Sequence, residues 1–201
     1  AIATFESTCK GSGISHAVTR ASGDPFEKMI SLAQYHDLMI FGLRSLFEFD
    51  FLETDGAGPL SRLVSSGVRP ILAVAKEYRP IRRVLLAYSG SMESASAIKR
   101  FVTMQLWSDL RFKIITFEHP NEIAQTLLND MAGYCRAHGH DVECEHVEGS
   151  PKQQLLQHAT GWNADLIVLG NGSKRLWLKK LLGDTAMNVI RHADIPLFVS
   201  Q

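Results

Sequence analysis

The second half of the chain alternates short apolar runs with longer segments whose apolar residues recur at helical spacing. The apolar runs and alternating segments predict strands at 83–88, 111–117, 140–148, 165–170 and 196–200. The helical spacing predicts helices at 92–107, 121–139, 150–162 and 185–193. Strands that alternate with helices form a parallel sheet covered on both faces, and such sheets bind ligands at the carboxyl ends of their strands.

The first half of the chain repeats part of this pattern. Residues 9–25 (CKGSGISHAVTRASGDP) align without gaps with 135–151 (CRAHGHDVECEHVEGSP), so that Cys, two Gly and Pro fall at equal positions. Further along, HDLMIFG resembles ADLIVLG, and GVRPILAVA resembles ADIPLFVSQ. Because a fixed period indicates a repeated structural unit, we predict two copies of one unit, joined around residues 76–83.

Composition argues against partners of extreme charge and against a membrane protein. The chain has 21 Lys plus Arg and 21 Asp plus Glu, so no net field favours nucleic acid. Its apolar runs are much shorter than the ~20 residues of a membrane-spanning helix. The three cysteines are sparse and odd in number, which indicates reduced thiols and a cytoplasmic location.

The loop at 170–185 (GNGSKRLWLKKLLGDT) is the segment most typical of ligand binding. Glycines let a backbone approach phosphate closely, and the N–H groups at a helix N-terminus attract anions. Asp184 opposes this interpretation, because Asp is among the best N-cap residues and its carboxylate would occupy the place of a phosphate. The basic residues Lys174, Arg175, Lys179 and Lys180 could offset that charge or form a solvated rim.

Several segments together resemble the universal stress protein family. They are VLLAYSGSMES, GSP at 149–151, ADLIVLGNGS and LLGDTAMNVIRHADIPLFVS. The whole chain is similar to a tandem member of that family, with residues 1–79 as the C-terminal part of a first domain and 80–201 as a complete second domain. The resemblance implies an α/β fold: a parallel five-stranded sheet in the order 3-2-1-4-5, flanked by helices, with the last strands of the two repeats paired antiparallel. It also implies a cytoplasmic stress-response protein that forms a homodimer or an intramolecular domain pair.

One subgroup of the family binds ATP through an acid at the end of the first strand and a Gly-x2-Gly-x9-Gly-Ser/Thr loop. This chain has Ser89, Ser173 and Asp184 at three of those positions, although Gly170 and Gly183 match. We therefore predict a non-catalytic protein without a cofactor, which acts through protein contacts and keeps a degenerate nucleotide loop. The alternative is binding of ATP or another adenine nucleotide. The candidate residues for that site are Tyr88, Ser89, Phe117, Gly170, Gly172, Ser173, Gly183 and Thr185.

The first unit lacks counterparts of residues 83–126. In the implied strand order, its predicted edge strand at 15–21 (SHAVTRA) would be separated from its other strands and left with unpaired backbone groups. We expect further residues upstream in the natural protein, or a strand pair swapped from another chain. The loop after the first unit's strand, at 42–61, is rich in acids and unsuited to phosphate.

Two other motifs have weaker support. SGSMES at 89–94 resembles the SGGxDS loop of ATP pyrophosphatases, which makes an adenylating enzyme a further alternative. His140, Cys144 and His146 share one face of a predicted strand, with His138 nearby. That spacing is unusual for zinc, so we predict an exposed edge strand and no metal site.

Overall fold

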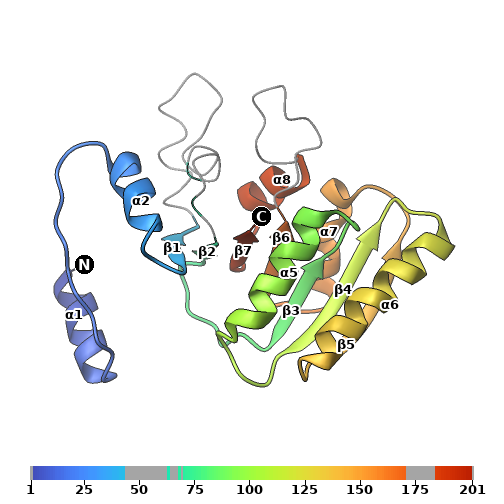
Figure 1. The fold of residues 1–201 in the computed structure, drawn as a ribbon, viewed down its shortest axis with the longest axis horizontal. Helices are drawn as coiled ribbons and strands as arrows, with labels where there is room; N and C mark the ends of the chain where they lie inside the picture. The colour runs from blue at the N-terminus through green and yellow to red at the C-terminus, as the bar shows by residue number, and fades with distance from the viewer. Residues whose placement is uncertain (1, 44–62, 64–67, 69, 171–183, 201) are drawn as a thin grey trace.

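The structure is a computed structural model that describes residues 2–43, 63, 68, 70–170 and 184–200. Its centre is a seven-stranded sheet in the order β1-β2-β7-β6-β3-β4-β5 (Figure 1). The strands are β1 Met39–Gly42, β2 Ile71–Val74, β3 Arg83–Ala87, β4 Arg111–Phe117, β5 Asp141–Val147, β6 Leu166–Gly170 and β7 Leu197–Ser200. The helices are α1 Ile2–Gly11, α2 Pro25–Ala33, α5 Met92–Met104, α6 Asn121–Ala137, α7 Pro151–Gly161 and α8 Asp184–His192.

The sheet is mixed, which corrects the expectation of a purely parallel five-stranded sheet. Strands β3 to β7 are mutually parallel, and their order is the one that the family resemblance implied. Strand β2 then pairs antiparallel with β7, with Ile71 opposite Val199 and Ala73 opposite Leu197. Both strands are apolar, and an unpaired apolar edge would be prone to association, so their pairing protects the edge of each. As a result, both halves of the chain contribute to one continuous sheet.

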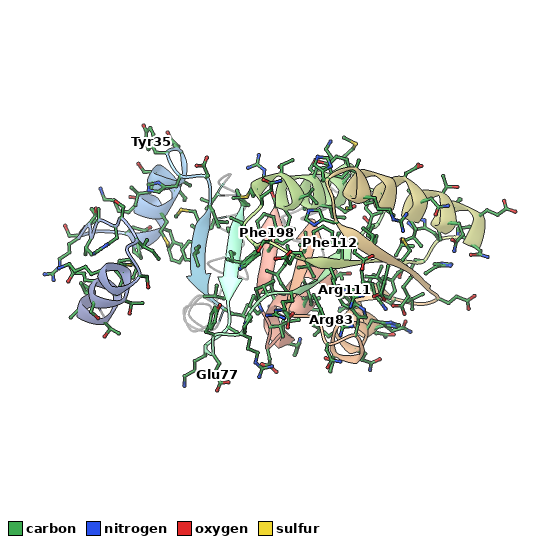
Figure 2. All side chains as sticks on the ribbon, turned by 90° about the horizontal axis from the view of Figure 1, so that it is seen from below. Tyr35, Glu77, Arg83, Arg111, Phe112 and Phe198 are labelled. Atoms are coloured by element: carbon green, nitrogen blue, oxygen red, sulfur yellow. The ribbon has the colours of Figure 1, made fainter. Side chains whose placement is uncertain are left out.

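Alternation of side chains along the central strands divides the core into two layers. In β3, Val84 and Leu86 pack with α5 and α6, whereas Leu85 packs with α7 and α8 on the other face. Figure 2 shows Phe112 and Phe198 in the interior of the molecule. Their rings both contact Phe101 of α5, with centroids 6.1 Å and 5.1 Å away. The helices therefore cover the two faces, and the carboxyl ends of the strands remain accessible.

The two repeated segments have similar local geometry. Gly23 and Gly149 both have a φ of 107°, in the region that favours glycine, and each lies two residues before a proline that starts a helix. The aligned cysteines, Cys9 of α1 and Cys135 of α6, are both buried. The two segments therefore share turns and helix starts as well as sequence.

The predicted strand at 15–21 is wrong. These residues form no strand and are mostly exposed, whereas the aligned segment of the second half is β5. The physical reason is pairing, because β5 is hydrogen-bonded to β4 along its whole length. In the described part of the first half, no strand occupies a position equivalent to β4.

Candidate functional site

A cavity of about 350 Å³ lies at the carboxyl ends of β3, β4 and β6. Tyr88, Ser89, Phe117, Gly170 and Thr185, all predicted from the sequence, line it together. The other predicted residues, Gly172, Ser173 and Gly183, lie outside the described residues, as do the four basic residues of the loop. Asp184 is the first residue of α8, but its side chain also lies outside the described set. The strand ends thus assemble the part of the predicted site that the structure describes.

Three serine hydroxyls form a cluster on the α5 side of the cavity. Ser91 caps the helix, since the backbone N–H of Ser94 donates to Ser91 Oγ at 3.2 Å. Ser89 Oγ donates to Ser91 Oγ at 3.1 Å and lies 3.2 Å from Ser94 Oγ. The candidate nucleotide residues predicted from the sequence did not include Ser91 or Ser94, although both belong to the SGSMES motif at 89–94. Their i, i+3 spacing at a helix start was the available signal, because that is the spacing of an N-cap bond.

Gly170 allows β6 to pack tightly under the start of α5. A Cβ atom at this position would lie 2.4 Å from Ser94 Cα and 2.5 Å from Ser94 N. Both are backbone atoms, so no side-chain rotation can relieve the contact. Glycine at the end of this strand is therefore required for helix packing, whether or not a phosphate approaches it.

Two residues that follow β4, Glu118 and His119, also line the cavity. Glu118 is exposed and has a φ of 59°, in the left-handed region that non-glycine residues seldom adopt. A ring nitrogen of His119, Nε2, lies 3.1 Å from the carbonyl oxygen of Ser89. This contact links the ends of β3 and β4. Sequence reasoning missed both residues because they lie in a connection without periodicity.

The electrostatics of the cavity combine helix N-termini with one carboxylate. The N-termini of α5, α7 and α8 border it, and the helix dipole places partial positive charge there. Glu118 is the one carboxylate among the described lining residues, which contain no Lys or Arg. Burial, followed by the nearby charge of Asp130, raises the pKa of the Tyr88 phenol. Tyr88 therefore remains a neutral hydrogen-bond donor at physiological pH.

The metal candidates on β5 are not gathered around a common point. In the part of the chain that the structure describes, no group of three His, Cys, Asp or Glu side chains could hold a metal ion. The His140 ring stacks on Phe112 with centroids 4.2 Å apart, and burial followed by the charge of His138 lowers its pKa. Cys144 Sγ lies 3.9 Å from the carbonyl oxygen of Leu128. These side chains thus contact neighbouring core and helix groups.

The described helices include none with both the length and the apolar character to span a bilayer.

Comparison with known proteins places this fold and cavity in context. Residues 102–201 match the model of the universal stress protein family. Universal stress protein Slr1230 of Synechocystis sp. is 24% identical over 200 residues, which cover 98% of this chain and 69% of that protein. The crystal structure of a universal stress protein from Archaeoglobus fulgidus has a TM-score of 0.76 to this chain. That similarity covers 99% of this chain and 74% of the other at 20% identity, so it concerns the fold alone.

A third comparison includes a ligand. The crystal structure of a universal stress protein in complex with cAMP matches 60% of this chain and 97% of its own, with a TM-score of 0.53 and 27% identity. Residues 102–201 thus match the universal stress protein family, and the chain is similar to universal stress proteins over nearly its whole length.

Proposed function

We propose that this chain is a two-unit universal stress protein that binds an adenine nucleotide with one phosphate, does no chemistry on it, and acts through protein contacts. The observation that carries the proposal is the cavity at the ends of β3, β4 and β6. Its volume of about 350 Å³ lies within the range for small-molecule sites. The sequence analysis gave adenine-nucleotide binding as the alternative to a degenerate loop without a ligand, and we now propose that alternative.

The walls of the cavity suit the separate parts of a nucleotide. The N-termini of α5, α7 and α8 border the cavity, and their partial positive charge favours an anion. Phe117, Leu155 and Leu169 provide an apolar surface against which a base can lie. The complex of a similar protein with cAMP agrees with a ligand of this class.

The contacts of the serines and of His119 support a non-catalytic role. The three serine hydroxyls hydrogen-bond to one another, and His119 faces the carbonyl oxygen of Ser89 rather than a hydroxyl. Among the described lining residues, no base is therefore hydrogen-bonded to a hydroxyl nucleophile, as covalent catalysis requires.

The two-unit organisation, with residues 1–79 and 80–201 as its parts, has two sources of support. The repeated segments share their glycine conformations and helix starts, and their last strands pair antiparallel. In addition, the similarity to the Archaeoglobus fulgidus structure extends over both halves of this chain. We propose a cytoplasmic location on the same grounds as in the sequence analysis.

Calorimetric titration with AMP, cAMP and ATP, together with mass spectrometry of co-purified small molecules, tests the proposal. We expect AMP or cAMP to bind with a dissociation constant of about micromolar order and ATP to bind more weakly. Thr185→Trp places a large side chain in the cavity and should raise the dissociation constant at least about tenfold. A tenfold change corresponds to about 1.4 kcal/mol of binding free energy. The matched control is Thr103→Trp, at an exposed site in the last turn of α5, and it should bind normally.

Two results would count against the proposal. If no adenine nucleotide binds at millimolar concentration, the site has another role and the original expectation of a degenerate loop stands. If incubation with ATP releases pyrophosphate, the protein is an enzyme of the adenylating class instead.

A further inference from the structure

We infer that Glu118 accepts hydrogen bonds from the ribose hydroxyls of the ligand, the 2′ and 3′ hydroxyls of AMP or the single 2′-hydroxyl of cAMP, and so sets both the orientation of the nucleotide and its preference for a ribose. This inference rests on the nucleotide proposal and adds to it a residue that determines specificity. Glu118 is the one carboxylate among the described residues that line the cavity.

A carboxylate at the β4 side of the cavity restricts how a nucleotide can lie there. Its negative charge repels phosphate, whereas the partial positive charge of the helix N-termini that border the cavity attracts it. An ionised carboxylate can only accept hydrogen bonds, so the part of the ligand beside it must carry donors. Two neighbouring hydroxyls match two carboxylate oxygens, and acids bind ribose hydroxyls in this way in other nucleotide folds.

The carboxylate of Glu118 is free to make these bonds. The side chain is exposed, and it makes no hydrogen bond or ion pair with any other residue that the structure describes. Ser89 at the end of β3 is a poorer candidate, because its hydroxyl already contacts Ser91 and Ser94.

The backbone holds Glu118 in a conformation that costs energy. Four described non-glycine residues have a positive φ, and among them Glu118 is the one that lines this cavity. Its neighbours fix it, since Phe117 ends β4 and is buried, and the ring of His119 contacts the Ser89 carbonyl. Glycine would adopt this φ without strain, so a glutamate at this position indicates a role for its side chain.

The test compares AMP with 2′,3′-dideoxyAMP, which lacks both hydroxyls. We expect the wild-type protein to prefer AMP about tenfold or more, as for hydrogen bonds to a charged group, and Glu118→Gln to bind both nucleotides with similar affinity. The matched control is Glu93→Gln, which removes an equal charge in the first turn of α5 without altering the cavity lining. It should keep the wild-type preference.

A second variant separates ligand binding from folding. Glu118→Gly should lose the preference for AMP while its melting temperature stays the same or rises, because glycine relieves the backbone strain. If the wild type binds both nucleotides equally, or if Glu118→Gln keeps the preference, the inference is wrong although nucleotide binding stands. If the wild type binds neither nucleotide, the proposed function fails and this inference fails with it.

Discussion

Gly170 illustrates how a packing requirement can explain a glycine that the sequence pattern assigns to ligand binding. The sequence indicated a phosphate-binding glycine, whereas the structure places Ser94 backbone atoms where its Cβ would be. Close packing against α5 and close approach of a phosphate would both require a residue without a side chain. The presence of glycine at this strand end is thus weak evidence for phosphate on its own.

Gly170→Ala should destabilise the protein by about 2–3 kcal/mol, because the new methyl group forces α5 away from β6. The matched control is Gly133→Ala in α6, where a Cβ meets nothing within 4 Å. That change should stabilise by about 0.5–1 kcal/mol, since alanine is the better helix former. Chemical denaturation measures the free energy of unfolding of both variants. Equal values would show that the structure adjusts to the new methyl group at residue 170 without loss of stability.

The site residues that could be predicted are those adjacent to predicted elements. Tyr88 and Phe117 were found because they lie at the ends of apolar runs, whose direction follows from a parallel sheet. Glu118 was missed because it lies in a connection, and its φ of 59° depends on how β3 and β4 are joined. The clash at Gly170 depends on where α5 crosses β6, which no local pattern encodes.

At the scale of elements, the pattern predicted the strands and helices of the second half well, since each buries a periodic apolar face. The first half shows the limit of such reasoning. Residues 15–21 align with β5 in the internal repeat, but a strand also requires a neighbouring strand to which it can hydrogen-bond. Because hydrogen bonding between strands is not local, the repeat alone could not predict this difference.

Helices α1 and α6 contain aligned sequence but should differ strongly in stability. Among its described residues, α1 buries Cys9 alone, whereas α6 buries five side chains against the sheet. A helix as short as α1 is marginal without tertiary packing. In native-state hydrogen exchange, amides of α1 should exchange with little protection and those of α6 only through major unfolding. Protection of α1 comparable to that of α6 would contradict this expectation.

At the scale of the whole molecule, the pairing of β2 with β7 determines how the chain unfolds. Phe198 of β7 lies opposite Leu72 of β2 on one side and Val168 of β6 on the other, and it is fully buried. The core layer to which it belongs includes residues of both halves. We therefore expect the strands to lose their structure together.

Phe198→Ala should cost about 3–5 kcal/mol, and hydrogen exchange should show an equal loss of protection in β2 and in β4. The control, Ile40→Ala in β1, changes a side chain that is 60% exposed and should have an effect below about 0.5 kcal/mol. A loss confined to β2 would show that the two halves unfold independently.

The antiparallel junction of β2 and β7 also gives the molecule two different ends. The carboxyl ends of β3, β4 and β6 lie at one edge of the sheet, while β1 and β2 run the opposite way and end at the other edge. A protein that recognises the filled or empty cavity must approach the first end. The two halves of the chain therefore present the carboxyl ends of their strands, where such sheets bind ligands, at opposite edges of one sheet.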